Sequence, residues 1–95
     1  MTVELTSEMY NANFRITDME CTRVCKDHTE GYVFGIRRNK YIPGGYEYVT
    51  WYYQERDGQY DFWWGHYFGS EEAAWKDFCK RSGNDIRAYE EVIGG

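Results

Sequence analysis

Aliphatic side chains are scarce in this chain of 95 residues. Leu, Ile, Val and Phe together number 16, or about 17% of the residues, and a share below ~20% is a sign of intrinsic disorder. The sequence has 10 Tyr and 4 Trp, however, and each large aromatic side chain can bury on the order of 150–250 Å². We therefore predict one folded domain over residues 1–95 with a core of aromatic rings. Some rings should stay exposed, because a domain of this size buries only about 60–70% of its surface.

Other features that the sequence lacks indicate where in the cell the protein is expected. No apolar run approaches the ~20 residues that a membrane-spanning helix needs. Glu4 and Glu8 lie where a signal peptide would have a basic start and an apolar run. The three cysteines are an odd number, which disfavours a disulfide framework and fits reduced thiols. We expect a cytoplasmic protein with no membrane partner.

Cations are also few. The chain has 11 Lys and Arg against 16 Asp and Glu, so its formal net charge is −5. Non-specific nucleic-acid binding depends on Lys and Arg that neutralise phosphates. The overall charge therefore disfavours a nucleic-acid partner and favours cationic partners.

The strongest structural signal in the sequence is that of a β-hairpin. Two runs rich in aromatic and β-branched residues, 46–54 and 59–68, flank the pair Asp57-Gly58, which is typical of a two-residue hairpin loop. On the register that this loop predicts, one face carries Val49, Trp51, Trp64 and His66. The opposite face carries four aromatic side chains: Tyr48, Tyr52, Trp63 and Tyr67.

Further elements flank the hairpin. Residues 31–38 alternate in polarity and predict a third strand, joined to the hairpin by a turn over 39–45. Residues 21–26 could add a fourth strand. The sequence Thr-Asp-Met-Glu at 17–20 also matches a helix capping box, so a short helix is the alternative there.

A helix is predicted after the hairpin, over residues 70–82. Ser70 can cap it, Glu71 and Glu72 suit the positive end of its dipole, and Gly83 can end it. An apolar stripe at helical spacing should pack on the sheet: Ala74, Trp75, Phe78 and Cys79. The tail over 84–93 could be helix or edge strand. The predicted class is α+β, with an antiparallel sheet of three or four strands and a helix packed on one face.

Few residues suggest chemistry. Cys21-x3-Cys25-x2-His28 has zinc-like ligand types, but structural zinc sites usually present a second pair of ligands, so we expect ordinary thiols. Cys79 lies on the packing stripe of the helix and His66 on the sheet, so neither predicts a nucleophile with its base. We expect no enzyme, no metal and no cofactor.

The aromatic face carries the functional prediction, since Tyr, Trp and Arg dominate the energetic centres of protein interfaces. We expect a non-catalytic protein-binding module that uses six residues: Tyr48, Tyr52, Trp63, Tyr67, Arg37 and Arg38. In a second hypothesis the same rings bind single-stranded nucleic acid, together with the basic cluster of Arg37, Arg38 and Lys40 beside Tyr41 and Tyr46. In a third, the face pairs with its own copy in a homodimer. If the termini cover the face as a second layer, no such role follows.

A family resemblance adds a setting. The stretches Tyr48-Val49-Thr50-Trp51, Trp64-Gly65-His66-Tyr67-Phe68 and Glu72-Ala73-Ala74-Trp75-Lys76-Asp77-Phe78 resemble small uncharacterised proteins of plasmids, conjugative elements and phages of Gram-positive bacteria. The resemblance covers roughly residues 31–81. It implies an accessory protein of a mobile element that acts by binding and blocking another protein. It brings no catalytic motif and no site residues.

Overall fold

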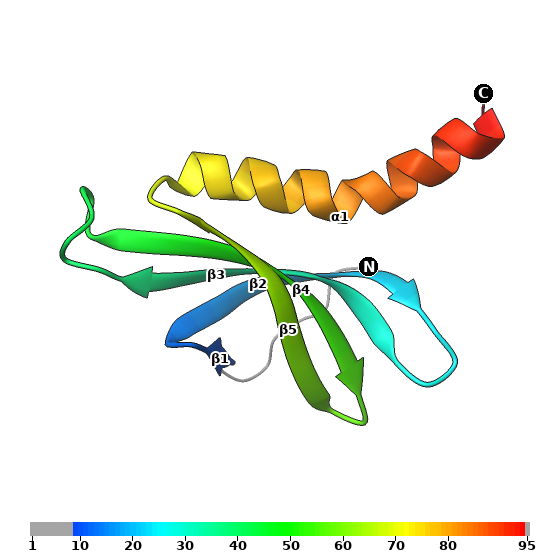
Figure 1. Ribbon diagram of the computed structural model, residues 1–95, viewed down its shortest axis with the longest axis horizontal. Helices are drawn as coiled ribbons and strands as arrows, with labels where there is room; N and C mark the ends of the chain where they lie inside the picture. The colour runs from blue at the N-terminus through cyan, green and yellow to red at the C-terminus, as the bar shows by residue number, and fades with distance from the viewer. Residues whose placement is uncertain (1–8, 95) are drawn as a thin grey trace.

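The computed structural model describes residues 9–94, with side chains described as far as Gly83. The chain forms five strands and then one helix (Figure 1): β1 (Tyr10–Asn11), β2 (Phe14–Val24), β3 (Thr29–Arg38), β4 (Tyr46–Arg56), β5 (Gln59–Phe68) and α1 (Glu71–Gly94). All strand pairs are antiparallel and the order in the sheet is that of the sequence, β1-β2-β3-β4-β5. The α+β class is confirmed, with five strands where three or four were expected.

The segment that matched a capping box lies inside β2, so the helix alternative is wrong. Phe14 and Ile16 are buried two residues apart, and so are Met19 and Cys21. Between these pairs the register with β3 shifts at Ile16/Asp18. A bulge adds one residue to a strand, so the buried residues Ile16 and Met19 lie three positions apart in the sequence and not two or four. This spacing resembles that of a helix.

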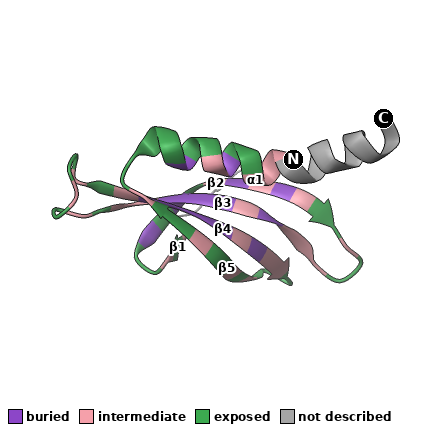
Figure 2. Ribbon diagram, turned by 45° about the horizontal axis from the view of Figure 1, so that its top comes forward, coloured by how far each residue is buried: buried purple, intermediate pink, exposed green. Residues whose placement is uncertain are grey.

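The sheet curls around one aromatic core. Its buried members come from β2, β3 and β4: Phe14, Ile16, Met19, Val33, Val49, Trp51 and Tyr53. The centroid of the Phe14 ring lies 5.5 Å from that of Trp51 and 5.9 Å from that of Tyr67. The start of β2 therefore lies close to β4 and β5. Figure 2 shows that burial is concentrated in β2, β3 and β4, whereas much of β5 is exposed.

The helix starts as predicted. The Ala73 backbone N–H donates to Ser70 Oγ at 3.2 Å, which caps the first turn. Gly83 does not end the helix, which continues to Gly94; glycine inside a helix costs only about 1 kcal/mol relative to alanine. The tail that the sequence left open is thus helical in its backbone.

The position of α1 differs from the prediction. Ala74 and Phe78 pack against Phe34 and Tyr48 in a second, smaller core. A straight helix meets a curled, twisted sheet along a limited strip, and α1 packs toward one edge of the sheet (Figure 1). Much of the same sheet face is left uncovered by the described part of the chain.

The hairpin loop forms at Asp57-Gly58, where φ is +50° and +80°. Pairs near the loop follow the predicted register, as in Tyr52 opposite Trp63. Beyond that pair the register shifts by one residue. Thr50 lies opposite His66, Val49 opposite Tyr67, and Tyr48 opposite Phe68. The predicted pairing of Trp51 with Trp64 is therefore wrong.

Gly65 explains the shift. A Cβ atom at this position would lie 2.6 Å from Nε1 of the buried Trp51 and 2.8 Å from the Tyr67 hydroxyl. Only glycine fits against these rings on the core side. Trp64 has a φ of +55°, and Trp64-Gly65 form a β-bulge that changes the side on which the rest of β5 points its side chains.

Candidate functional site

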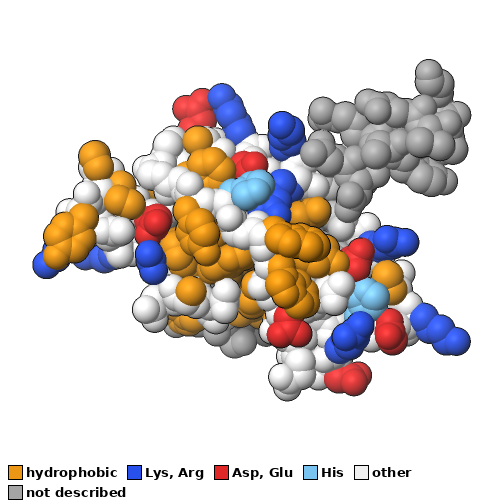
Figure 3. Space-filling model, in the orientation of Figure 1, with side chains coloured by type: hydrophobic (Ala, Val, Ile, Leu, Met, Phe, Trp, Pro, Cys, Tyr) orange, Lys and Arg blue, Asp and Glu red, His pale blue; other side chains and the backbone are white. Residues whose placement is uncertain are grey.

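A group of three neighbouring rings, two of them exposed, lies on β4 and β5. We call Tyr52, Trp63 and Trp64 the aromatic patch. The Tyr52 ring lies 4.9 Å from the Trp64 ring and 6.0 Å from the Trp63 ring, measured between centroids. Trp63 is 42% exposed and Trp64 is 69% exposed. Figure 3 shows hydrophobic side chains gathered on this face, beside the helix.

The bulge builds this patch. In a regular strand two consecutive side chains point to opposite faces, so Trp64 would point toward the core, as the sequence predicted. The bulge instead turns both tryptophans to the side of Tyr52. A positive φ is strained for a bulky residue such as tryptophan, and strain of this kind clusters at functional sites.

Two of the predicted face residues lie elsewhere. Tyr48 is only 9% exposed and packs in the core beneath α1. Tyr67 follows the bulge and lies on the opposite side of the sheet, with its ring against Trp51 and Phe14. The single-residue shift moves Tyr67 to the other face, and α1 covers Tyr48 on the face of Tyr52, so of the four predicted rings only Tyr52 and Trp63 remain together in the patch.

The predicted basic rim is also separate from the patch. Tyr32 pairs with Tyr52, and Arg38 lies six residues further along β3, which is roughly 20 Å at the usual rise of a strand. Arg37 is already engaged: its guanidinium contacts Glu47 Oε1 at 2.7 Å and lies over the Phe14 ring at 4.4 Å. These two arginines therefore belong to another surface.

A polar network that the sequence did not predict holds Tyr52 in place. The Tyr52 hydroxyl donates to Glu30 Oε2 at 2.9 Å, and Gln54 Nε2 donates to the Tyr52 oxygen at 2.9 Å. The same Glu30 oxygen lies 3.0 Å from His28 Nε2, and His28 Nδ1 lies 2.7 Å from Asp27 Oδ1. The aromatic patch is thereby linked to the turn between β2 and β3.

These contacts shift the titration of the groups. Hydrogen bonds to Asp27 and Glu30 raise the pKa of His28. Burial opposes ionisation of Glu30, but hydrogen bonds from His28 and Tyr52 together with the charge of Arg23 hold the pKa of Glu30 below its ordinary value. Burial and the nearby Glu30 raise the pKa of Tyr52. These contacts thus favour the ionised forms of Asp27 and Glu30, the protonated form of His28 and the neutral form of Tyr52.

A second network fastens α1 to the sheet. The buried Thr50 hydroxyl donates to Asp77 Oδ2 at 2.6 Å and accepts from Arg81 Nη1 at 2.9 Å. His66 Nδ1 lies 2.9 Å from the same Asp77 oxygen. Asp77 and Arg81 come from α1, Thr50 from β4 and His66 from β5. They act as a clamp between helix and strands.

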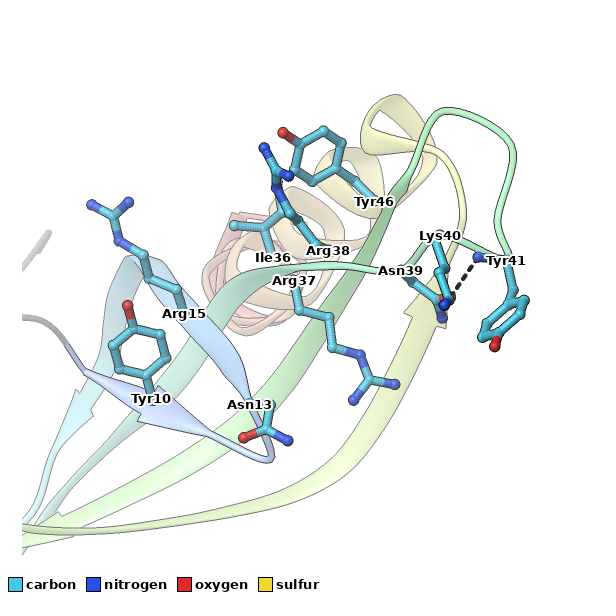
Figure 4. Close-up of a pocket in the computed structure, with 10 residues that line it drawn as sticks. All are labelled: Tyr10, Asn13, Arg15, Ile36, Arg37, Arg38, Asn39, Lys40, Tyr41 and Tyr46. Carbon is cyan, nitrogen blue, oxygen red and sulfur yellow. Dashed lines mark hydrogen bonds between the residues drawn. The ribbon is translucent and has the colours of Figure 1, made fainter.

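A basic groove lies at the far end of β3 (Figure 4). Its volume is about 740 Å³ and none of the described residues that line it is acidic. Four of its residues are cations from β2, β3 and the following loop: Arg15, Arg37, Arg38 and Lys40. Three are tyrosines: Tyr10, Tyr41 and Tyr46.

Three of the cations in the groove have no acidic partner among the described residues. Apart from Arg37, none of its cations forms an ion pair with another residue of the described chain. Arg38 lies over the Tyr46 ring at 5.9 Å, and the Lys40 ammonium lies 5.3 Å from the Tyr41 ring. The sequence singled out Arg37, Arg38, Lys40, Tyr41 and Tyr46. It missed Arg15, which the pairing of β2 with β3 brings opposite Ile36, and Tyr10, which the pairing of β1 with β2 brings opposite Arg15.

One signal for the bulge was present in the sequence. An isolated glycine inside a strand pattern is typical of a bulge or of close backbone contact. Gly65 follows two tryptophans within such a pattern. The two networks, in contrast, depend on register and on the path of α1, which leave no local signal.

Comparisons with protein-family models, with curated proteins and with solved structures return no match. The resemblance to proteins of mobile elements is therefore not tested by them. In the described residues no helix has the length and apolar character needed to cross a membrane.

Proposed function

We propose that this protein is a non-catalytic binding module that contacts a protein partner through the aromatic patch. The observation that carries the proposal is Trp64, which is 69% exposed and held by a strained bulge against Tyr52. A fold that needed this tryptophan only for stability would bury it, because burial is where a large ring contributes most.

The chemistry of the patch fits a protein interface. Trp and Tyr are enriched in interface centres because they bury a large area with few rotatable bonds. The Tyr52 ring is fixed by hydrogen bonds at its hydroxyl, so little side-chain entropy is lost when a partner docks.

The charge next to the patch selects the partner. Glu30 bonds to Tyr52, and Asp61 pairs with Gln54 in the next row of the sheet. A partner surface with Lys or Arg side chains would meet both the carboxylates and the faces of the tryptophan rings. Blocking such a surface is the mode of action that the resemblance to mobile-element proteins implies.

Capture of a partner from a lysate tests this role. Wild-type protein should retain a partner that a Trp63→Ala/Trp64→Ala double variant loses. Each interface tryptophan at a hot spot contributes about 2 kcal/mol or more, which is roughly 30-fold in affinity.

Tyr41→Ala is the matched control. Tyr41 is 85% exposed and lies outside the patch, so this variant should retain the partner fully. Circular dichroism should show the same fold for all three proteins. Equal capture by the wild type and the double variant would exclude the patch as the contact surface. Sedimentation of the purified chain shows whether it forms a dimer. It thereby distinguishes a second copy of the chain from a different protein as the partner.

The basic groove supports a second candidate function, the binding of a single-stranded nucleic acid. Its unpaired cations can contact phosphates, and its tyrosines can stack on bases. Three phosphate contacts would give a salt dependence with a slope of only about −2 for a single strand, so binding should be weak at physiological salt.

Fluorescence anisotropy with labelled single-stranded DNA and RNA at low salt tests this candidate. An Arg15→Ala/Arg38→Ala variant should bind at least tenfold more weakly than the wild type. A Lys76→Ala/Lys80→Ala variant, which removes the same charge from α1, should bind nearly as well as the wild type. Equal losses of affinity in both variants would show that only the net charge matters. An absence of binding by the wild type would exclude this candidate function.

A further inference from the structure

The turn between β2 and β3 gathers three side chains of metal-ligand type. Cys25 lies in the turn directly after β2, His28 lies directly before β3, and Glu30 is the second residue of β3. One atom from each, the sulfur, a ring nitrogen and a carboxylate oxygen, lies within 4.8 Å of the other two. Among the residues that the structure describes, no other group of three His, Cys, Asp or Glu side chains comes so close.

We propose that Cys25, His28 and Glu30 bind a divalent transition-metal cation of the zinc type. In tetrahedral zinc sites the metal lies about 2.0–2.3 Å from sulfur, nitrogen and oxygen ligands, which puts the ligand atoms about 3.5 Å apart. The three side chains are partly exposed, so changes of their torsion angles can bring the atoms to that spacing.

The backbone holds the ligands together. The Cys25 N–H donates to the His28 carbonyl oxygen at 2.8 Å, which closes the turn. Val24 and Thr29 pair across the ends of the two strands. Two of the ligands therefore lie at the ends of a closed turn, and the third follows on the strand that leaves it.

Asp27 completes the arrangement. Its carboxylate accepts a hydrogen bond from His28 Nδ1 at 2.7 Å, which leaves Nε2 on the side of Glu30. Histidines that bind metals typically donate their other ring nitrogen to a carboxylate, and this contact fixes the ring and strengthens the ligand. An incidental cluster has no need of such a contact.

Two further contacts hold the Glu30 carboxylate. The Tyr52 hydroxyl donates at 2.9 Å to Oε2, the oxygen that also meets His28, and Arg23 Nη1 lies 3.6 Å from Oε1. These contacts fix the carboxylate while leaving it close to His28. The spacing in the sequence suggested Cys21 as a ligand, but Cys21 is buried and Glu30 takes its place.

The ligand set selects the metal. Thiolate and imidazole favour zinc and its neighbours over magnesium and calcium, which prefer all-oxygen sites. Binding releases the proton of the Cys25 thiol and requires His28 Nε2 in its unprotonated form, with no change of oxidation state. Three protein ligands leave the fourth position to water, so the site is open to solvent.

Cobalt(II) is the spectroscopic probe for this site, because it accepts the same ligands and reports them in its absorption. The full chain, stripped with a chelator and kept reduced, should bind one Co²⁺ with a sulfur-to-cobalt charge-transfer band in the near ultraviolet. Added Zn²⁺ should displace the cobalt and abolish the band. A wild-type protein that gives no such band contradicts the proposal.

Matched variants locate the ligands. Cys25→Ser should lose the charge-transfer band, whereas Cys79→Ser, which changes an exposed thiol on α1, should keep it. Asp27→Asn keeps all three ligands and should weaken zinc binding by about 10–100-fold, whereas the exposed Asp61→Asn should not change it. A band that survives in Cys25→Ser, or equal affinities for Asp27→Asn and Asp61→Asn, would overturn the site. Circular dichroism of each variant checks the fold.

Discussion

Replacing Thr50 by valine tests how α1 is fastened to the sheet. Thr50 is fully buried on β4, and its hydroxyl both donates to Asp77 and accepts from Arg81. Valine has nearly the same shape, so packing is kept and the hydroxyl alone is lost. The variant therefore measures the hydrogen bonds of the clamp.

The structure sets the size of the effect. A hydrogen bond to an ionised group contributes about 1.5–3 kcal/mol, more than a neutral pair. Asp77 keeps its contact with His66 at 2.9 Å, and Arg81 keeps its bond to the Thr50 carbonyl oxygen at 3.1 Å, so only part of the clamp is lost. We expect the free energy of unfolding to fall by about 2–3 kcal/mol, a roughly 30- to 160-fold change in the unfolding equilibrium.

Urea unfolding at neutral pH, followed by tryptophan fluorescence, measures this loss. Thr22→Val is the matched control, because the Thr22 hydroxyl makes one long bond of 3.4 Å to a neutral carbonyl oxygen, that of Glu30. The control should change stability by less than about 0.5 kcal/mol. If Thr50→Val loses no more stability than Thr22→Val, the clamp does not hold the helix.

Three further predictions follow from single sites. Burial opposes the charge of Asp77, but bonds from Thr50 and His66 and the charges of His66 and Arg81 hold its pKa below the ordinary 3.8. The stability advantage of the wild type over Asp77→Asn should therefore be full above about pH 4 and shrink as the pH falls through the folded pKa, which urea unfolding at several pH values measures. Gly65→Ala should lose about 1–3 kcal/mol through its clash with Trp51, whereas Gly83→Ala, with open space around it, should be neutral or stabilising; equal thermal shifts would contradict the packing described. Burial raises the pKa of Tyr53 far above that of an exposed tyrosine, so Tyr53 should keep its proton as long as the protein is folded. In an alkaline absorbance titration, the wild type and Tyr53→Phe should therefore ionise the same number of tyrosines until the protein unfolds.

Local chemistry made part of the fold predictable. Asp57-Gly58 encodes its turn through two residues that tolerate positive φ, and Ser70 encodes the helix start through a cap, since each signal needs only its neighbours in sequence. The bulges in β2 and β5 do not work this way. The bulge in β5 shifts that strand by one residue where the Trp51 ring packs from β4 against Gly65.

The register shift in β5 also determines which rings form the candidate site. A regular strand would place Trp64 on the face of Trp51 and Tyr67 on the face of Tyr52, which is the arrangement that the sequence predicts. The aromatic character of the surface was predictable from composition, whereas the identity of its rings depended on one residue of register. Tyr52 and Trp63 were identified because they lie between the loop and the bulge.

Radical footprinting of the tryptophans, with and without the captured partner, tests the role of the aromatic patch most directly. Trp63 and Trp75 are equally accessible in the free chain, at 42% and 43%, but only Trp63 belongs to the patch. Added partner should lower the oxidation of Trp63 and Trp64 and leave Trp75 unchanged. Protection of Trp75 with no change at Trp63 and Trp64 would contradict the patch as the contact surface.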